Sequence, residues 1–149
     1  MKNCKNALIF TMFMAALAAM EAPEAKAVTW TVANQSTVAW DAVTETVEGK
    51  PFATGDEVKY AVHIVEEAKP KTDAIKLGET DQIEYTVTFE TEGKWLVGVQ
   101  TIRIPVASPT DRQVSSIIWS DSTNIVQVPV PFGFVYFAAP KPVGGLGPK

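Results

Sequence analysis

The chain has 149 residues, enough for one domain with modest extensions. Its 46% hydrophobic and 20% charged residues are typical of a folded globular protein and exclude wholesale disorder. The formal charge of −4 comes without a cluster of Lys and Arg, which argues against a nucleic-acid partner and against electrostatic docking on anionic lipid.

The first 27 residues have the pattern of an export signal. Lys2 and Lys5 precede an apolar run over Ala7–Met20, and Ala25-Lys26-Ala27 supplies the small residues that signal peptidase requires. We expect cleavage after Ala27, which leaves a chain that is secreted, periplasmic or on the cell surface. The alternative is a membrane anchor or a buried helix. It is disfavoured because a helix over the apolar run spans about 21 Å, short of the ~30 Å hydrocarbon core.

Cysteine use agrees with export. Cys4 is the only cysteine and lies within the expected signal, so the chain from Val28 onward has no disulfide, thiolate ligand or cysteine nucleophile. An exported, cysteine-free domain is typical of bacteria or their phages.

Short extended segments follow one another from Val28 to Val128, separated by turn residues. No helix is predicted after Ala27, and no internal repeat is visible. This pattern predicts an all-β antiparallel sandwich of about seven strands over residues 28–128. The segments are Val28–Val32, Thr37–Asp41, Glu57–Val65, Ala74–Leu77, Ile83–Phe89, Lys94–Gln100, Val114–Asp121 and Thr123–Val128.

The clearest alternation occurs over Gln82–Ile104. Apolar and polar residues alternate from Ile83 to Phe89, as in a half-buried strand, and alternation resumes after Thr91-Glu92-Gly93. Gly93 is free to adopt a positive φ angle in that turn. We therefore predict a hairpin-like pair of strands here.

The apolar faces of these strands define a predicted core between two sheets. Its members are large side chains that recur at period two. They are Trp40, Tyr60, Val62, Tyr85, Val87, Trp95, Val97 and Val99.

Residues 129–149 form a tail of different composition, rich in Pro and Gly, which resist regular sheet or helix. Four aromatic residues cluster in it: Phe132, Phe134, Tyr136 and Phe137. Two interpretations remain open. The rings fold back onto the sandwich as an edge strand, or the segment docks on another protein.

Several short motifs resemble the fibronectin type III family, and together they extend over about Val28–Val128. They are Trp40 with Asp41 on the second strand, Tyr60-Ala61-Val62 on the third, Gly93 to Val99, and Trp119-Ser120-Asp121 before the last strand. The resemblance implies an immunoglobulin-like sandwich. It also implies an adhesion, surface or virion accessory role.

The residues offer little for catalysis or metal binding. His63 is the only histidine, and alternation places it opposite Tyr60 and Val62, without a partner that a general base or a metal ligand needs. The acidic pairs Asp56-Glu57 and Glu66-Glu67 flank the third strand but lack the spacing of an EF-hand loop. We expect no catalytic, cofactor or metal site and no enzyme activity.

Function is therefore expected to lie in contacts with other molecules. The first hypothesis is a non-catalytic exported module that contacts proteins, or further copies of itself, by strand addition or through the aromatic tail. The alternative hypothesis is a small carbohydrate-binding module, because Trp30 and Trp119 lie outside the core pattern and aromatic faces commonly stack on sugars.

Overall fold

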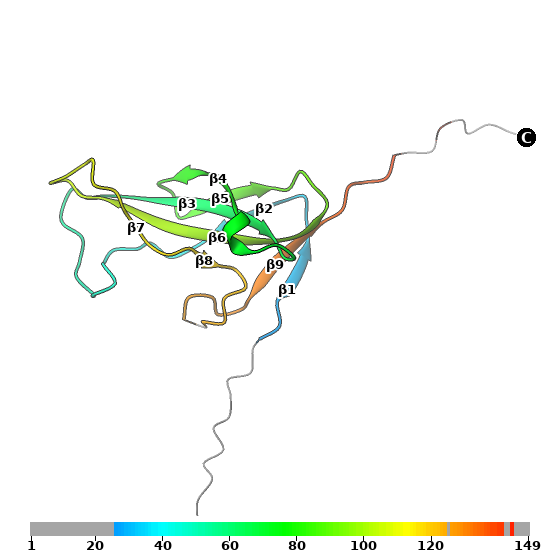
Figure 1. The fold of residues 1–149 in the computed structure, drawn as a ribbon, viewed down its shortest axis with the longest axis horizontal. Coiled ribbons are helices and arrows are strands. Elements are labelled where there is room, and N and C mark those ends of the chain that lie inside the picture. The colour runs from blue at the N-terminus through cyan, green and yellow to red at the C-terminus, as the bar shows by residue number, and fades with distance from the viewer. Residues whose placement is uncertain (1–25, 125, 142–143, 145–149) are drawn as a thin grey trace, which may run out of the picture.

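In the computed structural model, which describes residues 26–124, 126–141 and 144, the chain is nearly all β (Figure 1). This confirms the predicted all-β class. The helical element among these described residues is a single 3₁₀ turn, η1. The elements are β1 (Thr29–Val32), β2 (Gln35–Ala39), β3 (Glu57–Glu66), η1 (Lys71–Asp73), β4 (Ile75–Thr80), β5 (Glu84–Thr88), β6 (Gly93–Ile104), β7 (Gln113–Val114), β8 (Ile118–Trp119) and β9 (Phe132–Tyr136).

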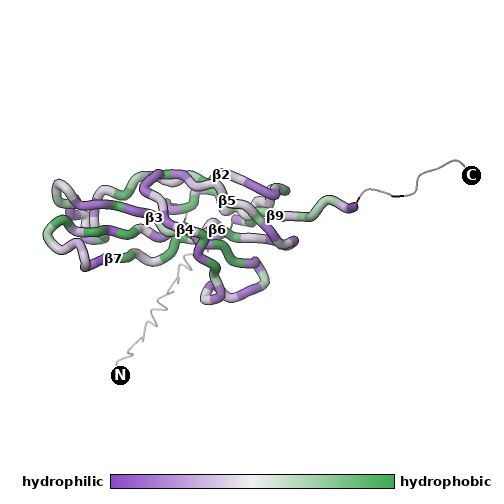
Figure 2. Tube along the Cα trace, turned by 90° about the horizontal axis from the view of Figure 1, so that it is seen from above, coloured by the Kyte–Doolittle hydropathy of each residue, from purple (hydrophilic) through white to green (hydrophobic). Residues whose placement is uncertain are grey.

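The strands form two sheets of unequal size. The large sheet has the order β1-β9-β6-β3-β4, with β7 and β8 also paired to β6. Among the residues that the structure describes, the small sheet consists of β2 and β5, paired antiparallel, and these lie together along one side of the molecule in Figure 2. Within the large sheet the pairs are antiparallel except for β1 and β9, which are parallel.

The predicted hairpin over Gln82–Ile104 is wrong. Both strands exist, but β5 pairs with β2 whereas β6 pairs with β3 and β9. Residues 89–92 therefore carry the chain from one sheet to the other. Gly93 has the expected positive φ, 150°, at the start of β6. Alternation predicted the strands correctly, but it carries no information about which strand each one pairs with.

The sheet continues beyond Val128, where the sequence placed the end of the sandwich. Residues 132–136 form β9, which lies between β1 and β6 instead of at an edge. By contrast, the segment Thr123–Val128, expected to be extended, contains turns and no strand among its described residues. The last strand of the sandwich therefore comes from the aromatic tail.

The main core fills the space between the two sheets. It includes five of the predicted core residues, Tyr60, Val62, Val87, Trp95 and Val97, which are buried. The other three, Trp40, Tyr85 and Val99, are only half-buried. The reason is the narrow second sheet, because two strands cannot cover the whole inner face of the large sheet. Further buried members that the sequence pattern did not assign are Val38, Ile64, Phe89 and Phe134.

A second apolar cluster covers the outer face of the large sheet. Val65 and Leu96 point away from the main core and pack with Trp119, while Trp30, Ala74 and Ile117 surround them. Apolar side chains thus pack on both faces of the large sheet, although part of its inner face stays uncovered, and this explains the near-continuous apolar run in β6.

Among the described residues, no helix is long and apolar enough to cross a membrane. The predicted export signal lies outside the described residues, apart from Lys26 and Ala27.

Candidate functional site

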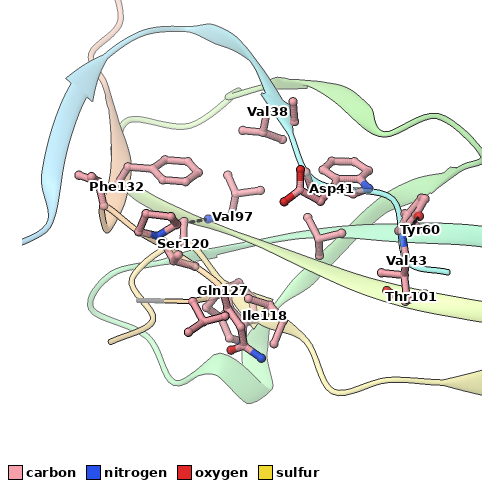
Figure 3. Close-up of a pocket in the computed structure, with 18 residues that line it drawn as sticks. Val38, Asp41, Val43, Tyr60, Val97, Thr101, Ile118, Ser120, Gln127 and Phe132 are labelled. Atoms are coloured by element: carbon pink, nitrogen blue, oxygen red, sulfur yellow. Dashed lines mark hydrogen bonds between the residues drawn. The ribbon is translucent and has the colours of Figure 1, made fainter. Parts of the chain in front are cut away.

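The candidate site is a groove on the inner face of the large sheet, beside the small sheet (Figure 3). Its volume is about 550 Å³, which is within the range of known ligand sites. We call it the β2 groove. One wall is β2 and the residues after it, the floor is β6, and the opposite wall is the segment leading into β9. The principal lining residues are Val38, Ala39, Trp40, Asp41, Val97, Val99, Thr101, Val128, Pro129, Val130 and Phe132.

The wall formed by β2 is an open strand edge. Ser36, Val38 and Trp40 direct their backbone groups toward β5, as the hydrogen bond from Trp40 N–H to the Ile83 carbonyl at 3.0 Å indicates. Because these groups alternate in an antiparallel pair, the N–H and C=O groups of Thr37 and Ala39 face away from β5. Ala39 lines the groove, so its backbone N–H and C=O groups, which pair with no residue in the described part of the chain, border an apolar floor.

Polar contacts fix the ends of the groove. The Val43 N–H donates to the Tyr60 hydroxyl at 3.0 Å, which ties the chain after β2 to β3. Ser120 is buried: its N–H donates to the Val97 carbonyl at 2.8 Å, and its hydroxyl accepts from the Val97 N–H at 3.1 Å. Phe132 N–H in turn donates to the Ser120 carbonyl at 2.9 Å. Through these bonds, Ser120 connects Val97 in the floor to Phe132 in the opposite wall and fixes their relative positions.

Asp41 is the charged residue of the lining. It lies two residues after the end of β2 and is exposed at the groove wall. The other lining groups are apolar or neutral, so the groove suits an apolar segment with a cationic group at one end.

Most of the aromatic residues in the tail pack on the sandwich instead of projecting from it to dock on another protein. Phe134 is buried, and Phe132 and Tyr136 pack against the main core from β9. Their rings are held by neighbours such as Phe89, whose centroid lies 5.3 Å from that of Phe134. Of the four, only Phe137 is freely exposed, at 65%. Packing in the core therefore accounts for three of these candidate interaction residues.

The two tryptophans proposed as sugar platforms are also largely covered. Trp119 is 8% exposed and packs over Gly98 in the outer cluster. Trp30 is half-buried against Gly133, and the Lys94 ammonium nitrogen lies 4.7 Å from its ring centroid. Trp119 thus lacks an exposed ring face, and Trp30 already has a cation over its ring.

His63 lies on the outer face, half-buried, away from the groove floor. Its Nε2 is buried without a hydrogen-bond partner among the described residues. Burial lowers the pKa of this imidazole, and the nearby Lys76 charge lowers it further. The described residues contain no group of three or more His, Cys, Asp or Glu side chains placed to hold a metal ion.

The acidic pairs beside β3 have structural contacts. The Asp56 side chain is 2% exposed and pairs with Arg103 at 2.6 Å, while its oxygens accept from the N–H groups of Val106 and Ala53 at 3.0 and 3.1 Å. The Val106 N–H, together with Arg103 and Ala53, lowers the pKa of Asp56. Glu66 pairs with Lys69 at 2.8 Å, and Glu67 with Lys94 at 3.5 Å.

Sequence reasoning missed the two walls of the groove as a site. Ala39 carries no chemical signal, and the approach of Val128–Val130 to β2 depends on tertiary structure. The sequence analysis used the motif Trp119-Ser120-Asp121 only for its resemblance to a family. It did not predict the two hydrogen bonds between Ser120 and Val97.

No protein-family model matches the chain. No curated protein matches it significantly.

Proposed function

We propose that this chain is an exported, non-catalytic β-sandwich module that acts through protein–protein contacts. The observation that carries the proposal is the β2 groove, in which an unpaired strand edge borders an uncovered apolar floor. An extended peptide satisfies both features at once, because its backbone pairs with the edge and its alternate side chains enter the groove.

The strand pairing supports assignment to the immunoglobulin-like class, and with it the fibronectin type III resemblance. In such sandwiches the second and fifth strands lie in one sheet, and the third, sixth and seventh in the other. Here β2 and β5 share the small sheet and β3, β6 and β9 share the large one, but β1 and β4 also lie in the large sheet instead of beside β2 and β5. A surface or virion accessory role follows from that resemblance.

The composition of the groove favours binding over catalysis. Hydrolytic sites need a nucleophile beside a base, or two carboxylates facing one substrate. Among the lining residues, Asp41 is the one carboxylate, and His63 lies on the opposite face of the large sheet.

The test is to screen the chain from Val28 onward against a displayed library of short extended peptides and, separately, against a glycan array. We expect peptides with alternating apolar residues to bind. Ala39→Pro should weaken their binding about tenfold or more, because proline removes the N–H that faces the open edge.

Glu84→Pro is the matched control. Glu84 is directly opposite Ala39 in the β2–β5 pair, and its N–H faces the other side of the small sheet. Peptide binding should survive this change. Binding to glycans but not peptides, with loss on Trp30→Ala, would overturn the proposal in favour of a carbohydrate-binding module.

A further inference from the structure

The open edge of β2 lacks the usual protection against strand addition. Natural edges are blunted by charges, prolines or bulges. The β4 edge has Lys76 and Glu79, paired at 2.5 Å, and a register shift beside it, and the outer edge of β5 has Glu84. From Gln35 to Ala39, β2 has no charge, no proline and no register shift.

A candidate occupant exists in the same chain. After β9, residues 137–141 (Phe-Ala-Ala-Pro-Lys) leave the sandwich and project away from it in both Figures 1 and 2. We call this segment the arm. All five of its residues are exposed, including Phe137. One bond fixes its direction, from the Ala138 N–H to Glu92 Oε1 at 2.7 Å.

The arm and the groove match in length and in charge. Phe137 to Lys141 spans four residue steps, about 13 Å in extended form, and the groove floor from Val97 to Thr101 spans the same number of steps along β6. The arm is apolar apart from its terminal Lys141, and the groove is largely apolar with Asp41 at its wall. Lys141 forms no ion pair with any residue that the structure describes.

The direction of β9 favours a second copy over the arm's own groove. Phe132, at the start of β9, lines the groove, and the strand then runs about 13 Å away from it before the arm begins. To enter its own groove, the arm would have to reverse and give up the bond to Glu92.

We propose that the arm of one copy inserts into the β2 groove of a second copy, with Phe137 over the floor and Lys141 beside Asp41. The inference rests on the proposed function, since it names the partner of the same groove. The added backbone pairs with Ala39 through the residues before Pro140, which has no N–H to donate. Because the arm and the groove are different surfaces, the contact is head-to-tail and builds closed rings or open chains of copies.

The test is light scattering of the chain from Val28 onward over a concentration series. The wild type should show mass that grows with concentration. Asp41→Lys and Lys141→Glu should each raise the dissociation constant about tenfold or more, through repulsion and loss of the ion pair. The double variant should regain association, which a folding defect would not allow.

The matched control is Asp111→Lys, which makes the same charge change at an exposed residue outside the groove lining. It should leave association unchanged. A wild type that stays monomeric at all concentrations, or a double variant that does not recover, would overturn the inference.

A pair of introduced cysteines distinguishes between insertion of the arm into its own groove and insertion into the groove of a second copy. The chain from Val28 onward has no native cysteine, so Ala39→Cys and Ala138→Cys can be made in separate chains and mixed under oxidation. A disulfide-linked dimer of the two variants supports insertion between copies. If the link forms only within a chain carrying both changes, the arm folds back on itself and the inference fails. Peptide binding to a monomeric chain would leave the proposed function standing while this inference falls.

Discussion

The indole nitrogen of Trp95 donates a hydrogen bond to the carbonyl oxygen of Thr91, four residues earlier, at 3.0 Å. This bond closes the connection in which the chain passes from the small sheet to the large one. The ring itself lies 6.3 Å from that of Phe89, at the other end of the same connection. Trp95 therefore fixes both the backbone of the crossing and the core beneath it.

Trp95→Phe should lower the free energy of unfolding by about 1–3 kcal/mol, because the Thr91 carbonyl loses its donor and the core loses ring area. Denaturant unfolding measures the change. Trp40→Phe is the matched control. The Nε1 of Trp40 is buried without a partner among the described residues, so its removal leaves no acceptor without a donor, and the loss of stability should be smaller and limited to the lost ring area. Equal losses from both substitutions would contradict the role of the bond to Thr91.

Gly133→Ala should destabilise the sandwich by about 1–3 kcal/mol, the usual cost of overpacking. A Cβ at Gly133 would collide with the Trp30 ring, which lies directly over this residue of β9. Adding Trp30→Leu should recover part of the loss by relieving the collision. Gly144→Ala, where nothing lies within 4 Å, should change nothing. Thermal unfolding of the four proteins checks the prediction.

The protein should lose stability as the pH falls below 6.5, the ordinary value for histidine, because burial and Lys76 lower the pKa of His63. Below pH 6.5 the imidazole binds a proton more readily in the unfolded chain than in the folded chain. The stability that neutral His63 contributes is therefore fully present above pH 6.5 and is lost as the pH falls toward the lower pKa of the folded state. His63→Gln should flatten the stability profile below pH 6.5. An unchanged slope in the variant would show that another group titrates there.

Asp56→Asn should destabilise the chain at neutral pH, since Arg103 and the N–H of Val106 need the carboxylate. The pKa of Asp56 is lowered in the folded state, so its stabilisation is present above pH 3.8 and is lost as the pH falls through the folded-state value. The stabilities of wild type and variant should therefore converge at low pH. A constant difference down to pH 2 would contradict this assignment.

Sequence patterns predicted where the strands lie in the chain better than they predicted which strands pair with each other. The alternation in Glu57–Val65 and Ile83–Phe89 corresponds closely to β3 and β5. Alternation reports which face of a strand is buried, and it is silent about pairing. For that reason the chain from β5 to β6 was expected to be a hairpin and instead joins two sheets.

The tail and the groove show a second limit. Phe132 to Tyr136 follow Pro129 and Pro131, and this proline-rich composition argued against a strand. The strand forms nevertheless, because it pairs with residues more than a hundred positions earlier in the chain. The groove depends on what is missing next to β2, namely a third strand in the small sheet. No local pattern in residues 35–41 reports the absence of a neighbour.

The parallel pairing of β1 with β9 joins residues 29–32 to residues 132–135. β1 cannot pair with β9 until the last part of the sandwich is available to fold. An exported chain crosses a membrane with its N-terminus ahead, so in that setting the sandwich completes only when translocation is nearly finished. Long-range parallel contacts of this kind also slow folding, because the whole intervening chain must be closed into a loop first. Under the proposed export, this topology would leave the sandwich incomplete until its last strand has crossed the membrane.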